Sequence, residues 1–180
     1  RKLRVGYVSG DFRHHSAVLI FGSVLICHDT SQYETYCYSM AGSSDAITDQ
    51  IREKASVWRD ISIWDDDRLD QQVREDQIDI LVDLSGHSAG NRLRVFARKP
   101  APVQVTAWGY ITGTGLDAID YLFADADTGH PDEEQWYSEE IVRLPRIVSY
   151  WPPDASIVGA PGPLPCRRNG HLTFGVFNRL

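Results

Sequence analysis

The sequence predicts an α/β fold built on a doubly wound, Rossmann-like parallel sheet, and three observations support this class. Apolar segments rich in β-branched and aromatic residues alternate with helical segments through residues 1–150. Residues 78–84 are nearly continuous in Ile, Leu and Val, as expected of a strand covered on both faces. Gly-rich, polar turns follow several apolar segments. Such alternation predicts parallel strands joined by right-handed crossovers.

Each element follows from a local pattern. The expected strands combine apolar, aromatic and β-branched residues, and they are 3–9, 33–40, 57–61, 78–84, 103–108 and 120–124. The expected helices lie between these strands and cover residues 17–28, 65–76 and a short segment after residue 90. One more expected helix is capped by Ser44-Asp45 and runs through Ala55. Ser16 is the expected N-cap of the first helix, and Leu69 and Val73 are spaced to turn the third toward the sheet.

The most informative stretch runs from residue 78 to 115 and contains two strands, each followed by a Gly-rich turn. The first turn is Ser85-Gly86-His87-Ser88-Ala89-Gly90, and the second covers residues 109–115. In open parallel sheets, ligands bind outside the carboxyl ends of the strands, where such turns meet. We therefore expect the functional site at this edge of the sheet.

Charge and composition exclude several classes of protein. The formal net charge is −7 and the sequence pI is about 5.3, and no cluster of Lys and Arg indicates a nucleic-acid partner. The longest apolar run, 17–27, is too short and too interrupted to span a bilayer, so no membrane partner is expected. Cys27, Cys37 and Cys166 are odd in number and fit no metal spacing, which favours reduced thiols and a cytoplasmic location.

The composition changes near Tyr150. Residues 151–170 are rich in Pro and Gly and lack apolar periodicity, which is typical of a linker. Residues 171–178 then have the pattern of a new strand. Because the chain also starts at Arg1 rather than Met, we expect a cut: a lobe over 1–150, the linker, and in 171–180 the first strand of a second lobe that is otherwise absent.

One motif suggests a hydrolase. Gly86-His87-Ser88-Ala89-Gly90 matches G-x-S-x-G, the nucleophile elbow, with Ser88 as nucleophile. An acid and a His would complete the triad, and Asp125 or Asp127 with His171 has the required order. Two observations count against it: no HGGG-like stretch lies upstream, and His171 follows the expected linker. A serine hydrolase and a non-catalytic binding lobe remain the alternatives at this point.

The first loop concentrates polar side chains, namely Asp11, His14 and His15. A metal site is disfavoured because adjacent His side chains diverge and a third ligand is needed. A His at the start of a helix suits another role, since the helix dipole disfavours imidazolium and leaves a ring that accepts a proton or hydrogen bond. A simple helix cap is the alternative. The glycines of 109–115 would let a sugar or phosphate approach the backbone closely, or serve only the turn.

Several segments together resemble the catalytic region of the O-linked N-acetylglucosamine transferases and their SPINDLY relatives. The resemblance runs in order through nearly the whole chain, over 3–12 with His15, 78–87, 98–105, 108–110, 120–121, 137–145 and 172–178. It implies the two-lobed GT-B fold, with this chain as the N-terminal lobe. The missing C-terminal lobe would hold the nucleotide pocket, and tetratricopeptide (TPR) repeats would precede the lobe.

The resemblance also implies an activity. Enzymes of this family invert the anomeric centre, glycosylate Ser or Thr of acceptor proteins and use a nucleotide sugar without metal or cofactor. We expect UDP-GlcNAc as donor, with GDP-fucose, the donor of SPINDLY-type enzymes, as the alternative. The fragment alone is expected to be inactive, and the G-x-S-x-G match coincidental.

The family's site residues map onto matching positions. His15 corresponds to the catalytic His, and the predicted substrate-binding residues are Asp11, Ser16, His87, Trp108, Gly109 and Tyr110. One departure stands out. Ile111 occupies the position of a Pro that usually follows Gly-Tyr in the second turn, so the shape of that turn is an open question.

Overall fold

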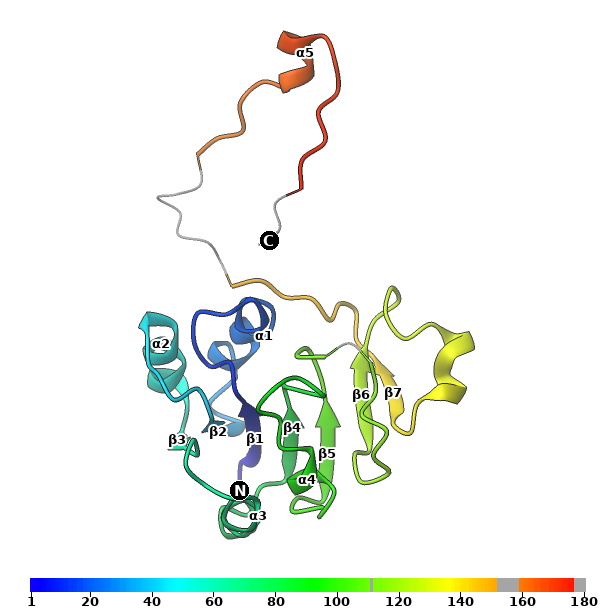
Figure 1. The fold of residues 1–180 in the computed structure, drawn as a ribbon. Coiled ribbons are helices and arrows are strands. Elements are labelled where there is room, and N and C mark those ends of the chain that lie inside the picture. The colour runs from blue at the N-terminus through cyan, green and yellow to red at the C-terminus, as the bar shows by residue number, and fades with distance from the viewer. Residues whose placement is uncertain (111, 152–158, 177–180) are drawn as a thin grey trace.

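A computed structural model describes residues 1–110, 112–151 and 159–176 and shows one seven-stranded parallel sheet (Figure 1). The strands are β1 Leu3–Ser9, β2 Tyr33–Ser39, β3 Val57–Asp60, β4 Ile80–Asp83, β5 Val103–Thr106, β6 Tyr121–Ala124 and β7 Glu140–Arg143. All six strands expected within residues 1–150 are present. The seventh, β7, was not expected, because four residues that are nowhere fully buried give little strand signal.

The strand order is β3-β2-β1-β4-β5-β6-β7. The chain therefore begins with β1 in the middle of the sheet and adds β2 and β3 on one side. It then crosses back to place β4 on the other side of β1, followed by β5, β6 and β7. This is a doubly wound sheet with its switch point between β1 and β4, which confirms the predicted fold class. Val8 pairs with Asp83, and Asp83 with Thr106, so these three central strands end at nearly the same level.

Helices cover both faces of the sheet. The helices α1 (Ser16–Ile26) and α2 (Ala46–Lys54) contribute Val18, Phe21 and Ile51 to one apolar core. The other core takes residues from α3 (Asp66–Glu75) and from the short α4 (Leu93–Phe96). A 3-10 helix, η1 (Pro131–Trp136), precedes β7, and α5 (Pro165–Asn169) lies near the end of the chain. No helix in the described part is long and apolar enough to cross a membrane.

Local capping explains where the helices start. Asp45 and Thr48 form a reciprocal capping box at α2, where the sequence predicts the cap, and Asp65 caps α3 by accepting the Arg68 N–H. The first helix differs from the prediction: its N-cap is His15 rather than Ser16. The His15 backbone is extended, and its ring accepts the N–H of Ala17, so the helix begins at Ser16 itself.

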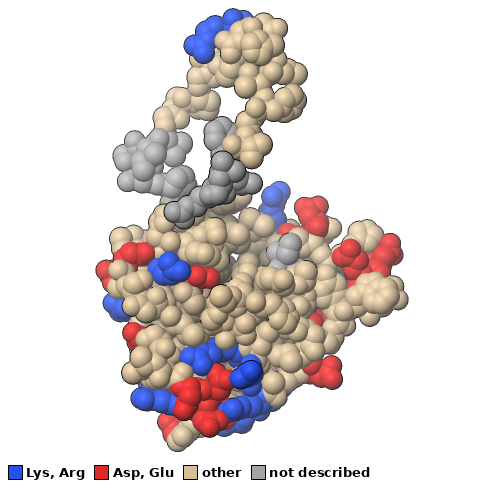
Figure 2. All heavy atoms as spheres, in the orientation of Figure 1, with Lys and Arg blue, Asp and Glu red and all other residues tan. Residues whose placement is uncertain are grey.

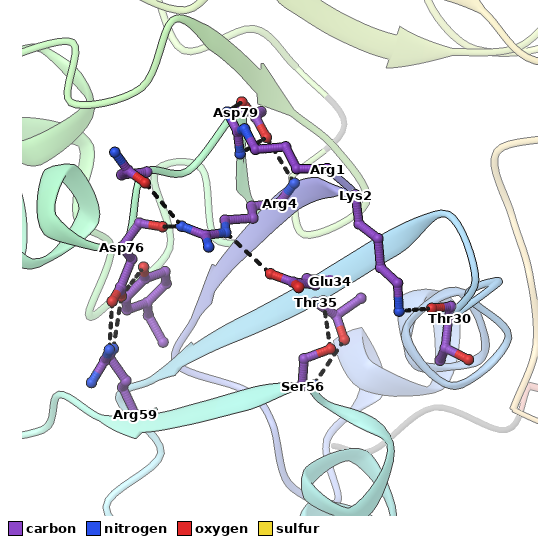
Figure 3. Close-up of polar contacts among 12 residues, drawn as sticks. Arg1, Lys2, Arg4, Thr30, Glu34, Thr35, Ser56, Arg59, Asp76 and Asp79 are labelled. Atoms are coloured by element: carbon purple, nitrogen blue, oxygen red, sulfur yellow. Dashed lines mark hydrogen bonds and ion pairs between the residues drawn. The ribbon is translucent and has the colours of Figure 1, made fainter.

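A partly buried ion pair joins β3 to the end of α3. Asp76 is only 8% exposed and receives two hydrogen bonds from Arg59, at 2.7 and 2.5 Å, and one from the Tyr38 hydroxyl at 2.7 Å (Figure 3). Arg4 reaches the Asp76 carbonyl and Glu34. Figure 2 shows Lys and Arg mixed with Asp and Glu at the lower end of the molecule, where α3 lies in Figure 1. The polar contacts of Asp76 with Arg59, Tyr38 and Arg4 indicate a structural role for this cluster.

After β7 the chain returns over the sheet to α1 (Figure 1). Ser149 bonds Ser23, and the Trp151 N–H donates to the Leu19 carbonyl at 2.8 Å, with the Trp151 ring against Gly22. Trp151, the first residue of the expected linker, is therefore packed on the lobe. Residues 171–176 form no strand, with exposed apolar side chains at Leu172, Phe174 and Val176; the rest of the expected segment 171–180 lies outside the described residues.

Candidate active site

Three loops meet at the carboxyl edge of the sheet. They follow β1, β4 and β5, which are neighbours in the sheet (Figure 1). The loops after β1 and β4 are close, since a Cβ on Gly10 would lie 4.0 Å from the Ala89 carbonyl oxygen. This contact lies next to the switch point between β1 and β4, where open α/β sheets bind ligands.

The two turns touch through glycines. A Cβ on Gly109 would lie 1.5 Å from the Leu84 carbonyl oxygen. Gly86 has a φ of +50°, and a Cβ there would lie 2.3 Å from Cβ of Tyr110. Any larger residue at either position would push the turns apart, so these glycines are required by close backbone approach.

Asp83 holds the first turn from below. Its carboxylate is 1% exposed and accepts the N–H groups of Ser85 and Gly86, at 3.1 and 2.9 Å, and the Thr106 hydroxyl at 2.9 Å. Burial raises the pKa of this carboxyl, and the hydrogen bonds oppose that rise. Asp83 thereby ties the end of β4, the first turn and β5 together.

His87 links the first turn to the second. Its Nε2 lies 3.0 Å from the Thr114 carbonyl oxygen, and its ring packs edge-on to Tyr110 with centroids 5.8 Å apart. A carbonyl only accepts, so Nε2 carries the hydrogen. In the neutral ring, Nδ1 is then left as a hydrogen-bond acceptor.

Glu139 holds the second turn. The carboxylate is 4% exposed, accepts the Thr114 N–H at 2.6 Å and the Thr114 hydroxyl, and receives the Ser138 hydroxyl at 3.0 Å. Sequence reasoning did not single out Glu139 as a site residue. Its only signal was its place in the resembling segment 137–145, since its partner Thr114 is 25 positions away along the chain.

A cavity of about 650 Å³ lies beside this second turn. Its walls are polar and aromatic, formed by His87, Thr112, Gly113, Thr114, Gly115, Glu133, Trp136, Tyr137, Ser138 and Glu139. Trp136 at the rim is 78% exposed, and η1 makes that rim acidic. The cavity is large enough for a monosaccharide or a peptide side chain.

His15 lies at the start of α1 with two competing partners. Its Nδ1 is 3.2 Å from the Ala17 N–H and 3.5 Å from Oδ1 of Asp11. Accepting from Ala17 places the ring proton on Nε2, whereas donating to Asp11 leaves Nε2 as a proton acceptor. The side chain is 41% exposed, so solvent or a ligand can reach it.

The other predicted residues of this loop lie apart in role. Ser16 is exposed at the first position of α1. His14 is exposed, and its backbone N–H donates to Asp45 at 2.5 Å. Within 1–110, 112–151 and 159–176, no three His, Cys, Asp or Glu residues are grouped to hold a metal ion.

Trp108 does not face the cavity with its ring. Its N–H donates to the Ile147 carbonyl at 2.6 Å, and its indole packs edge-on against Phe123 at 5.8 Å. These contacts hold Trp108 at a φ of 55°, a strained value for a bulky residue. Any substrate contact from Trp108 would come from its backbone. Gly109 and Tyr110 lie where the turns meet, with Tyr110 39% exposed.

The nucleophile elbow is not formed. β4 ends at Asp83 and α4 begins only at Leu93, so Ser88 lies within a long loop rather than on a sharp strand-to-helix turn. The positive φ values of this loop fall on Gly86 and Gly90. Asp125 is committed to the Ile147 and Thr128 N–H groups. The geometry gives the hydrolase alternative no support.

Known proteins resemble the chain along its length. The sequence is 41% identical over 186 residues to a Petunia hybrida protein named probable UDP-N-acetylglucosamine–peptide N-acetylglucosaminyltransferase SPINDLY, a match covering 100% of this chain and 20% of that protein. The Arabidopsis thaliana protein named SEC is 35% identical over 146 residues, covering 81% of this chain and 15% of SEC. The chain spans a fifth or less of the length of these curated relatives.

A solved structure agrees. A mutant O-GlcNAc transferase of Thermobaculum terrenum superposes with a TM-score of 0.79 and 45% identity, over 86% of this chain and 30% of that one. The sequence profile described as glycosyl transferase family 41 matches residues 1–150, which contain the three loops and the cavity described above. The chain belongs to glycosyl transferase family 41.

Proposed function

We propose that this chain is the N-terminal lobe of an inverting protein O-glycosyltransferase that moves a sugar from a nucleotide donor to Ser or Thr of acceptor proteins. The observation that carries this proposal is the 41% identity, over the whole chain, to a protein named as a peptide N-acetylglucosaminyltransferase. The geometry of the site supports it, because this edge of the sheet carries a polar cavity lined by His87, a glycine-lined approach, and His15 at the start of α1.

In this reaction the acceptor hydroxyl attacks the anomeric carbon from the face opposite the nucleotide. The new carbon–oxygen bond forms as the bond to the diphosphate breaks, and the diphosphate leaves with the electron pair. His15 is our candidate for receiving the hydroxyl proton, at Nε2. That role requires the ring to donate Nδ1–H to Asp11, now 3.5 Å away, in place of its contact with Ala17.

The second half of the crevice would hold the sugar. His87, Gly109 and Tyr110 are placed to contact it through the ring acceptor, the open backbone and the partly exposed phenol. Positioning of this kind accounts for a large share of the rate in bimolecular transfers. Trp108 contributes through its backbone, and Ser16 through a hydroxyl beside His15. No metal ion or other cofactor enters this scheme.

The remaining partners belong to the longer protein. We propose that residues 151–170 lead to a C-terminal lobe whose first strand lies in 171–180 and whose remainder binds the diphosphate. The alternating apolar side chains of Leu172, Phe174 and Val176, all exposed here, support this role. TPR repeats would precede the lobe and help to bind acceptor proteins. The three free cysteines suit a cytoplasmic enzyme, and 1–180 alone would not transfer sugar.

The donor is the finer part of the proposal, with UDP-GlcNAc favoured over GDP-fucose. The test is to incubate the full-length protein that contains this chain with acceptor protein and each nucleotide sugar, and to identify the product by mass spectrometry. We expect addition of N-acetylhexosamine. Addition of deoxyhexose alone would replace the donor assignment, and absence of both products would remove the transferase proposal.

A further inference from the structure

We propose that Glu139 is a positioning residue for the transfer: its buried carboxylate fixes the second turn and, through the Thr114 carbonyl, the orientation and tautomer of His87. The inference rests on the proposed function, since it concerns how that crevice is kept ready for sugar transfer. Glu139 directly precedes β7 and lies outside the three loops where the site was expected.

Glu139 is buried among neutral hydrogen-bond donors. At 4% exposure, its carboxylate is held by the Thr114 N–H, the Thr114 hydroxyl and the Ser138 hydroxyl. All of these are neutral hydrogen-bond donors. Among the residues that the structure describes, no Lys or Arg forms an ion pair with Glu139. Burying a carboxylate without a neighbouring cation costs free energy of folding. Features that cost stability in this way occur mainly at functional sites.

Thr114 contacts both Glu139 and His87. Its N–H and hydroxyl point to Glu139, while its carbonyl oxygen lies 3.0 Å from Nε2 of His87. Gly113 makes the fit close, because a Cβ there would lie 2.7 Å from Oε2 of Glu139. Holding the Thr114 N–H and side chain therefore also fixes the direction of the carbonyl.

The tautomer of His87 depends on the Thr114 carbonyl. With Nε2–H committed to the carbonyl, the neutral ring presents Nδ1 as its acceptor, suited to a hydroxyl of sugar or protein. Without Glu139, the Thr114 carbonyl is free to turn away. His87 then loses its fixed tautomer, and a hydrogen bond that must be ready before reaction is no longer preorganised.

Hydrogen exchange tests the mechanical link without relying on activity. The full-length protein is compared with Glu139→Ala, with Glu139→Gln, which keeps the shape and an accepting oxygen, and with Glu140→Ala, the exposed neighbouring carboxylate, as control. We expect peptides covering both turns, 84–90 and 109–116, to exchange at least about fivefold faster in Glu139→Ala alone. β4 should keep its protection. Unchanged exchange in both turns would overturn the inference, as would faster exchange confined to 109–116.

A double-mutant cycle tests whether Glu139 acts through His87. We expect Glu139→Ala to lower kcat/KM about a hundredfold, Glu139→Gln to restore most of it, and Glu139→Ala added to His87→Ala to cost little more than His87→Ala alone. Fully additive losses, or near-wild-type transfer by Glu139→Ala, would overturn the inference while leaving the proposed function intact. A wild-type protein that transfers no sugar would instead remove the proposed function, and the exchange experiment would still decide the link.

Discussion

Gly109 lies directly against the Leu84 carbonyl, so close that a Cβ on Gly109 would fall 1.5 Å from that oxygen. The contact joins the ends of two neighbouring strands by backbone alone. Neither strand end can move aside easily, because Asp83 ties both to the same carboxylate. The shape of the crevice therefore depends on a missing side chain as much as on those present.

Gly109→Ala should separate the two turns. Overpacking of this kind costs about 1–3 kcal/mol, and we expect a lower melting temperature together with a loss of transfer. Gly10→Ala is the matched control, since its nearest neighbour to an added Cβ is 4.0 Å away. Thermal melts of both full-length variants check the expectation. Equal melting temperatures for the two would show that the turns yield without strain.

Arg59 should matter far more to stability than other surface arginines. Asp76 is buried, and removing Arg59 as Arg59→Leu leaves its carboxylate short of its charged partner, at an expected cost of about 3–5 kcal/mol. Arg74→Leu breaks a pair with the half-buried Asp70 and a hydrogen bond to the Arg98 carbonyl, and should cost under about 1 kcal/mol. Denaturant unfolding measures both changes. Similar values for the two variants would mean that Asp76 is hydrated in solution.

His28 should make stability fall at acid pH. Burial lowers its pKa from the ordinary value of 6.5, and the Tyr7 hydroxyl lies 2.6 Å from Nε2. Tyr33 packs on the same ring, and Asp29 follows it in the chain. Because the folded-state pKa is depressed, this contribution is full above pH 6.5 and is lost as the pH drops through the lower, folded-state pKa.

His28→Gln is expected to flatten that part of the pH profile. Unfolding is followed in denaturant at several pH values between neutral and mildly acidic, for wild type and variant. The other titratable groups are the same in both proteins, so the difference between the two curves isolates His28. Parallel curves would contradict the assignment.

The sheet could be predicted from sequence because its signals are local. Apolar runs such as 78–84 and the cap Asp45 specify an element without reference to the rest of the chain. Contacts across the fold could not be predicted in this way. Glu139 meets Thr114 only because β7 is added beside β6, and β7 itself has almost no strand pattern.

Side-chain direction was the other gap. The sequence predicts Trp108 at the end of a strand, and it follows β5 closely, but its indole turns to Ile147 because the returning chain after β7 offers a carbonyl there. The His15 ring likewise takes the capping position expected of Ser16. Both outcomes depend on a few hydrogen bonds of about 1 kcal/mol each, which residue patterns alone do not encode.

His15 carries the last prediction, because it has both a structural and a chemical role. As N-cap, its Nδ1 accepts the Ala17 N–H at 3.2 Å, and replacing it with Ala should cost about 1 kcal/mol of stability. Asn is among the best N-caps, so His15→Asn should restore that stability but supply no imidazole. If Nε2 of His15 takes the acceptor proton, both variants of the full-length enzyme lose at least about a hundredfold in turnover. Melting temperature and transfer rate, measured on each variant, separate the two roles. A His15→Asn enzyme that regains both stability and turnover would reduce His15 to a helix cap and move the chemistry to another residue of the crevice.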